Sequence, residues 1–124
     1  MNARNIRFLQ QAKKIANLSN ERFKVGAIVT KGNRILGLGV NVNKTHPKSN
    51  GRFKTLHAEH SAILDAGLNE LQGSTVYVFR STKDTLPANS KPCPSCYKLL
   101  KEAGVKEVYF SLPEFPYYGV EVYA

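Results

Sequence analysis

Two short polar motifs constrain what this chain can fold into. HAE at 57–59 and PCPSC at 92–96 each follow a β-rich run and its loop, and each opens a run of helix-forming composition. Cysteines three positions apart lie on one face of a helical turn, and a helix N-terminus lowers the pKa of a thiol through its free N–H groups and its positive dipole end. We therefore expect two helices whose N-termini point at one edge of a sheet, with the motif side chains meeting there.

Hydrophobic periodicity places these motifs within an α-β-β-α-β-α-β order. Apolar residues recur at three- and four-residue spacing between Arg4 and Leu18, which predicts a helix with its stripe at Ile6, Phe8, Leu9, Ala12, Ile15 and Ala16. The remaining runs predict strands at 25–30, 34–40, 75–82, 105–112 and 119–123 and helices at 57–68 and 96–104.

The order of these elements predicts the fold class. The first two strands are joined by a hairpin signal, whereas the alternation in the second half favours parallel pairing through right-handed crossovers. We therefore expect a three-layer α/β/α chain in which helices flank both faces of a mixed five-stranded sheet, forming one domain over residues 1–124.

The stretch before the HAE motif is polar and basic. Residues 41–56 contain Pro47 and Gly51, and we interpret them as a surface loop near the substrate. The loop carries a cluster of cations that holds the phosphate of a nucleotide, tracks a nucleic-acid backbone or forms an ordinary solvated surface: Lys44, Lys48, Arg52 and Lys54.

The charge balance favours an anionic ligand. The chain has 124 residues with 18 Lys and Arg against 9 Asp and Glu, and the net charge of +9 attracts phosphate through its summed field. A basic surface that only confers solubility is the alternative. The N-terminal segment lacks the apolar core of a secretory signal, and no run of about eighteen apolar residues occurs, so we expect a soluble cytoplasmic protein with no membrane partner.

His57, Cys93 and Cys96 form a candidate metal site. One imidazole and two thiolates suit zinc and leave its fourth position open for water, as in catalytic sites. Such a site lowers the pKa of water to about 7. Glu59, two residues after the ligand histidine, is placed to carry a proton from water to a reacting base. Together, H-x-E and P-C-x-x-C are the signature of zinc-dependent nucleobase deaminases, which predicts one catalytic zinc ion per chain.

Two other interpretations of the cysteines stay open. Cys93 and Cys96 could act as a thioredoxin-like redox pair, which leaves His57 and Glu59 without a role. A fourth ligand from His60 would instead close a structural zinc site and make the chain a non-catalytic binding module. We expect His60 to be a packed or solvated side chain.

Residues 4–112 resemble the cytidine and deoxycytidylate deaminase superfamily, particularly its short phage and bacterial members. The resemblance rests on HAEHSAI, NSKPCPSC, FKVGAIV and GLGVN. It implies a cytidine-deaminase-like fold and hydrolytic deamination of cytosine to uracil with release of ammonia. It also implies that Asn41 binds the sugar, that the Ala58 backbone meets the base and that Val25 lies against its ring.

The same resemblance leaves the substrate open. A nucleotide or nucleoside, with dCMP or deoxycytidine favoured, is the first expectation, and cytosine, or less readily adenosine, in single-stranded DNA or RNA is the alternative. Relatives commonly form dimers or larger homo-oligomers.

The aromatic tail, with Phe115, Tyr117 and Tyr118, either stacks flanking bases or, as we favour, packs onto the sheet. Further candidate substrate contacts are Phe23, Asn43, His46 and Lys54.

Overall fold

A computed structural model of the chain describes residues 3–19, 24–45, 53–67, 71–82 and 86–123. The helices in these ranges are α1 (Ala3–Ala16), α2 (Ala58–Ala66) and α3 (Pro94–Glu102). The strands are β1 (Lys24–Lys31), β2 (Arg34–Val40), β3 (Val42–Thr45), β4 (Phe53–Leu56), β5 (Thr75–Ser81), β6 (Pro87–Ala88), β7 (Glu107–Ser111) and β8 (Tyr118–Val122). Among the described residues, no helix combines the length and the apolar character that crossing a bilayer requires.

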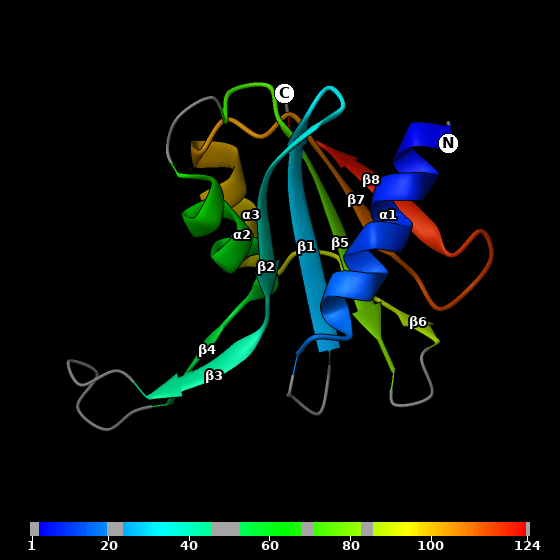
Figure 1. The fold of residues 1–124 in the computed structure, drawn as a ribbon, viewed down its shortest axis with the longest axis horizontal. Coiled ribbons are helices and arrows are strands. Elements are labelled where there is room, and N and C mark those ends of the chain that lie inside the picture. The colour runs from blue at the N-terminus through cyan, green and yellow to red at the C-terminus, as the bar shows by residue number, and fades with distance from the viewer. Residues whose placement is uncertain (1–2, 20–23, 46–52, 68–70, 83–85, 124) are drawn as a thin grey trace.

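The main sheet is mixed and has the strand order β2-β1-β5-β7-β8, with the two-residue β6 beside the end of β5. β1 is antiparallel to both β2 and β5, β5 and β7 are parallel, and β8 is antiparallel to β7. α1 covers one face of the sheet, whereas α2 and α3 cover the other (Figure 1). The predicted three-layer arrangement, its five strands and the parallel pairing are therefore confirmed, and β6 adds a short sixth strand.

β5 is apolar from residue 76 to residue 79 because both of its faces are covered there. Val76 and Val78 belong to the core cluster beneath α2 and α3, whereas Tyr77 and Phe79 belong to the cluster beneath α1. Successive side chains of a strand point to opposite faces, so a central strand between two helical layers reads as an unbroken hydrophobic run.

The buried stripe of α1 differs from the predicted one at its start. Phe8, Leu9, Ala12 and Ala16 are buried as expected, but Ile6 is 42% exposed, so the prediction for that residue is wrong. Asn5 lies inward instead, where its amide accepts a hydrogen bond from the Tyr77 hydroxyl (2.6 Å) and donates one to the Tyr109 hydroxyl (2.9 Å). The tyrosines under the first turn therefore favour a polar partner over an apolar one.

Two glycines on β2 set how closely α2 approaches the sheet. A Cβ atom at Gly37 would lie 2.5 Å from the Ala62 carbonyl oxygen, and one at Gly39 would lie 2.3 Å from the Ala62 nitrogen. Real Cβ contacts are not this short, so a side chain at either position would push α2 outward. The G-L-G pattern of β2 thus fixes the position of the helix that begins at the HAE motif.

The prediction of a loop over 41–56 is wrong for the two segments that form β3 and β4. These strands pair antiparallel, with Val42 opposite Leu56 and Thr45 opposite Phe53, in a sheet of their own. β-Branched residues in both arms, and an aromatic residue in β4, favour strand conformation despite the polar composition. Residues 46–52, which include Pro47 and Gly51, lie outside the described residues.

Candidate active site

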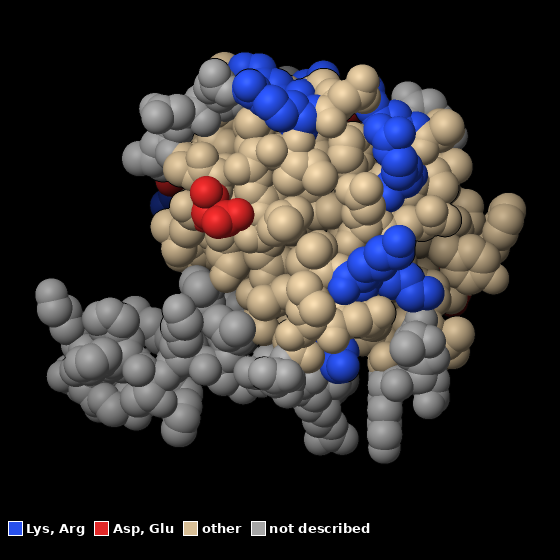
Figure 2. Space-filling model, viewed as in Figure 1, with Lys and Arg blue, Asp and Glu red and all other residues tan. Residues whose placement is uncertain are grey.

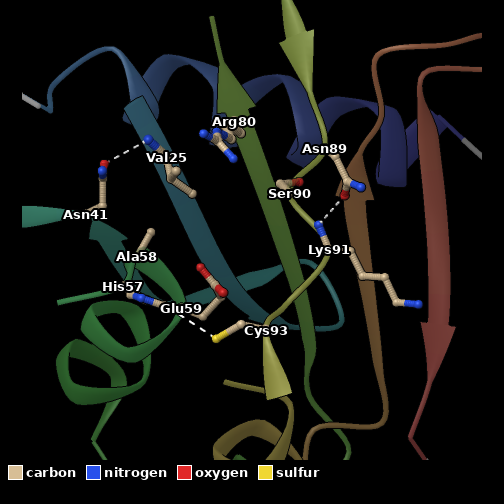
Figure 3. A pocket seen from close by; sticks show the side chains of 10 residues that line it. All are labelled: Val25, Asn41, His57, Ala58, Glu59, Arg80, Asn89, Ser90, Lys91 and Cys93. Atoms are coloured by element: carbon tan, nitrogen blue, oxygen red, sulfur yellow. Dashed lines mark hydrogen bonds between the residues drawn. The ribbon is translucent and has the colours of Figure 1, made fainter. Parts of the chain in front are cut away.

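The ends of α2 and α3 bring the two motifs together. His57 is the N-cap of α2 and Cys93 the N-cap of α3; both have extended backbone, and neither side chain caps its own helix. The imidazole and the thiol instead lie toward each other between the helices (Figure 3). His57 Nδ1 is 3.6 Å from Cys93 Sγ and 3.1 Å from Cys96 Sγ.

The geometry of these three side chains fits a zinc ion. Their ligand atoms all lie within 4.8 Å of one another. Tetrahedral bonds of about 2.0 Å to nitrogen and 2.3 Å to sulfur place the two ligand atoms roughly 3.6 Å apart, which is close to the separations that His57 makes with both thiols. His57, Cys93 and Cys96 are thus positioned to hold one metal ion and to leave a coordination position for water.

The two thiols differ in how readily they ionise. Burial opposes ionisation of Cys93, but hydrogen bonds from the Cys96 backbone N–H and the Ser95 hydroxyl outweigh it and lower the pKa of the Cys93 thiol to about 7. Burial, with the Glu59 carboxylate nearby, raises the pKa of the Cys96 thiol. A metal ion must therefore displace a proton from Cys96, and binding is coupled to pH.

Glu59 is a buried carboxyl group in the first turn of α2. Its side chain is only 5% exposed and points into the space beside Cys93 (Figure 3). Burial raises the pKa of this carboxyl, against the lowering effects of its own backbone N–H, Cys96 and His57. A carboxyl whose pKa is raised holds a proton more readily than a free carboxyl does, which suits a group that must take up and pass on protons.

A cavity of about 300 Å³ opens in front of these residues. The residues that line it include His57, Glu59 and Cys93 as well as Val25, Asn41 and Ala58. The three substrate-binding residues that the resemblance implies therefore lie in the same cavity as the motif residues. Asn41 Oδ1 accepts a hydrogen bond from the Val25 backbone N–H at 2.8 Å, which fixes the orientation of the amide (Figure 3).

The other candidate contacts do not enter this description. Asn43 and Lys54 belong to β3 and β4, whose side chains are not described, and Phe23 and His46 lie outside the described residues. Within the described ranges, the metal-ligand cluster holds three residues, and His60 is not among them. His60 is half-buried and lines a second cavity with Ser95 and Leu99, on the other side of His57 and Cys96.

Four residues that line the main cavity were given no role by the sequence analysis, although three of them belong to the NSKPCPSC segment: Arg80, Asn89, Ser90 and Lys91. Arg80 was detectable in principle, because the alternation of β5 places it on the same face as Val76 and Val78. The other three lie between β6 and α3, where no periodicity predicts a direction.

The aromatic tail is less packed than expected. Phe115 is 85% exposed and Tyr117 is 51% exposed, so the prediction that both pack onto the sheet is wrong. Their rings contact each other edge to face, with centroids 6.0 Å apart. Tyr118, the first residue of β8, does pack against the α1 cluster, as predicted.

The fold and the site together define a zinc-dependent deaminase, a class of hydrolytic enzymes. Residues 3–112 match the cytidine and deoxycytidylate deaminase zinc-binding region, and the chain belongs to this family.

Two curated relatives support the assignment. An uncharacterised deaminase from the luxG 3′ region of Aliivibrio fischeri is 32% identical over 112 residues, covering 83% of this chain and 69% of that protein. Deoxycytidylate deaminase of Mycobacterium phage D29 is 30% identical over 111 residues, covering 73% of this chain and 79% of that protein.

Solved structures show the same architecture. The dCMP deaminase of cyanophage S-TIM5 in apo form is 29% identical, with a TM-score of 0.69 over 90% of this chain and 86% of that one. The same enzyme in complex with dCMP and dUMP is 28% identical, with a TM-score of 0.69 over 90% and 84% of the chains. Cytidine deaminase from Burkholderia pseudomallei, at 20% identity and a TM-score of 0.70 over 99% and 94%, supports the fold alone.

Zinc binding should depend on the thiols and not on His60. We expect one zinc ion per chain, and we expect Cys96→Ser to weaken zinc binding more than about 100-fold, beyond the effect of losing an outer-shell partner. Affinity should fall as pH is lowered, because both thiols bind as thiolates. Competition with a chromogenic chelator measures these constants. His60→Ala serves as the control; loss of zinc in that variant would favour the four-ligand structural site.

Proposed function

We propose that this enzyme hydrolyses cytosine to uracil in a nucleotide or nucleoside, with dCMP or deoxycytidine as the favoured substrate. The observation that carries the proposal is the position of Glu59. Its buried carboxyl lies in one cavity with the metal ligands His57 and Cys93, and Asn41 and Val25 line the same cavity. A redox role for Cys93 and Cys96 would give neither Glu59 nor the cavity a function.

The residues divide the reaction between them. Zinc held by His57, Cys93 and Cys96 would supply an activated water as the nucleophile. In this scheme the water oxygen would add to the ring carbon that bears the amine, while Glu59 takes one proton from the water and transfers it to the ring nitrogen. Glu59 would then pass the second proton of the same water to the amine, the C–N bond would break, and ammonia would leave as the carbonyl of uracil forms.

Three residues of the cavity hold the substrate in this scheme. The Ala58 backbone contacts the base, Val25 packs against its ring, and Asn41 binds the sugar. The bond from the Val25 N–H to Asn41 Oδ1 supports this arrangement, because it holds the amide ready before the substrate arrives.

A deoxyribonucleotide is favoured by the relatives. One curated relative is a deoxycytidylate deaminase, and the S-TIM5 enzyme is described in complex with dCMP and dUMP. The net charge of +9 also favours a substrate that carries phosphate.

A substrate panel tests the proposal. The zinc-loaded enzyme is assayed on cytidine, deoxycytidine, CMP, dCMP and a single-stranded oligonucleotide that contains cytosine, with ammonia release as the readout. We expect the highest kcat/KM with dCMP. Zinc-loaded enzyme that is silent on all five would refute cytosine as the substrate and favour a non-catalytic zinc protein.

Deamination within single-stranded nucleic acid is the second candidate. Basic side chains are spread over the face seen in Figure 2, and acidic side chains are sparse among the described residues on this face. The exposed pair of Phe115 and Tyr117 would suit base stacking. A preference for the oligonucleotide in the panel would establish this alternative.

A further inference from the structure

We propose that Arg80 forms an anion subsite at the end of the cavity and binds the 5′-phosphate of a cytosine nucleotide, which makes the free 5′-monophosphate the preferred substrate. This inference rests on the proposed deaminase function and identifies the substrate class that the site selects.

The alternation of β5 directs Arg80 into the cavity. Val76 and Val78 are fully buried in the core beneath α2 and α3, and Arg80 is the next residue on that face. Arg80 is half-buried and lines the cavity. A guanidinium therefore takes the place of a third core residue at the point where the core gives way to the substrate site.

Arg80 also continues the row of residues that would hold the nucleoside. It pairs with Val25 across β1 and β5, and directly opposed residues of antiparallel strands have side chains on the same face. On its other side, Val25 is bonded to Asn41 through its backbone N–H. The row therefore runs from Asn41 through Val25 to Arg80.

The metal ligands lie away from Arg80. In Figure 3, Arg80 lies beside Val25 at the opposite end of the cavity from Cys93 and His57, with Glu59 between the two ends. A base bound beside Glu59 with its sugar at Asn41 would direct the 5′ substituent toward the guanidinium. Phosphate is the group that a guanidinium binds well at that position, because its paired N–H donors match two phosphate oxygens.

Buried serine hydroxyls hold the backbone of Arg80 in place. The Arg80 N–H donates to Ser111 Oγ at 2.9 Å, and Ser111 Oγ is 2.6 Å from the Ala88 carbonyl oxygen, which it bonds as donor. Ser111 is fully buried, and Ser90 Oγ donates to the Val78 carbonyl oxygen at 2.9 Å. A side chain that starts from a fixed strand end loses less conformational freedom when it binds an anion.

Charge on the cavity wall favours the same end. Among the described residues that line it, Glu59 is the carboxyl group and Arg80 and Lys91 are the cations. Lys91 forms an ion pair with Glu121 at 3.5 Å, and its side chain extends away from the cavity in Figure 3. Arg80 is a cation of the cavity wall that an anion bound at this end of the cavity would meet.

The test compares dCMP with deoxycytidine in variants of Arg80. In Arg80→Ala, the ratio of kcat/KM for dCMP to kcat/KM for deoxycytidine should fall roughly 10- to 100-fold, the range expected for a charge-assisted hydrogen bond. Arg80→Lys keeps the charge but not the paired donors, so its ratio should fall by a smaller factor, and it reports on the site even if the alanine variant does not fold.

Arg34→Ala is the matched control. Arg34 is an exposed arginine at the start of β2, whereas the cavity residue Asn41 follows the end of that strand. Arg34→Ala therefore changes the net charge by the same amount as Arg80→Ala, but at the end of β2 that lies away from the cavity. Its ratio should equal that of the wild type, and an equal fall in Arg34→Ala and Arg80→Ala would overturn the inference in favour of a general charge effect.

The outcomes separate this inference from the proposed function. An enzyme that deaminates deoxycytidine and dCMP but keeps its substrate ratio in Arg80→Ala refutes the subsite alone. Wild type that prefers the cytosine oligonucleotide to dCMP refutes the choice of a free monophosphate. Wild type inactive on every cytosine compound refutes the proposed function itself.

Discussion

Glu59→Gln should lower kcat for deamination at least about 1,000-fold while leaving zinc binding within a few-fold of the wild type. The amide keeps the shape of the side chain but cannot carry a proton, and positioned proton transfer contributes on the order of 10²–10⁴-fold to a rate. Here one carboxyl would serve two transfers, so the loss should lie in the upper part of that range. Ammonia release at saturating substrate and metal content measure the two quantities.

Glu102→Gln is the matched control for this prediction. Glu102 is an exposed residue near the end of α3, so the substitution changes the charge equally and should leave kcat unchanged. A Glu59→Gln variant that retained zinc and a tenth or more of the wild-type rate would contradict the assigned role.

The same substitution has a consequence for stability. Because burial raises the pKa of Glu59 in the folded chain, the folded state binds this proton more tightly than the unfolded state does. The contribution of protonated Glu59 to the stability of the folded state is therefore fully present below the pKa of this carboxyl in the unfolded chain. It is lost as pH rises through the higher pKa of the folded chain, because a carboxylate is then buried. Metal-free Glu59→Gln should accordingly melt at a higher temperature than the metal-free wild type near neutral pH, where the difference in Tm is measured by calorimetry.

Gly39→Ala should destabilise the protein by about 3 kcal/mol or more and weaken zinc binding. The added methyl group would lie 2.3 Å from the Ala62 nitrogen and 2.4 Å from the Ala58 carbonyl oxygen. Backbone atoms of a helix cannot yield individually, so α2 must move as a unit, and overpacking of this kind costs about 1–3 kcal/mol or more. Because His57 is the N-cap residue of α2, the same movement displaces a metal ligand.

Gly32→Ala distinguishes close packing from backbone strain. Gly32 has φ of +64°, and a Cβ atom there would meet nothing within 4 Å. Its replacement should cost only the roughly 1–2 kcal/mol of a left-handed residue and should leave zinc affinity unchanged. Urea denaturation and chelator competition compare the variants, and a Gly39→Ala protein as stable as Gly32→Ala would show that α2 tolerates a wider separation.

Periodicity and spacing predict the framework of this protein well. The valines of β5 alternate with aromatic residues because helices cover both faces, and HAE and PCPSC begin helices at the predicted places. Local chemistry suffices there: a strand period, a helix period, and two motifs whose side chains must converge to hold one ion.

What the sequence does not reveal depends on distant partners. Asn5 is buried because its amide hydrogen-bonds to the Tyr77 and Tyr109 hydroxyls, and no pattern within α1 indicates those partners. β3 and β4 stabilise each other across a polar hairpin, so neither arm shows a buried face of its own. The position of Arg80 in the cavity depends on the pairing of β5 with β1, which places it opposite Val25.

Because two of the metal ligands are the N-cap residues of α2 and α3, a bound metal ion would cross-link distant parts of the chain. His57 and Cys93 are 36 positions apart, and an ion held by both closes the intervening segment, which includes β5, into a loop. Closing a loop of that length restricts the unfolded ensemble, and an ion that binds only the folded form shifts the equilibrium further toward it. Removal of zinc should therefore make the folded chain easier to unfold, in addition to removing the nucleophile.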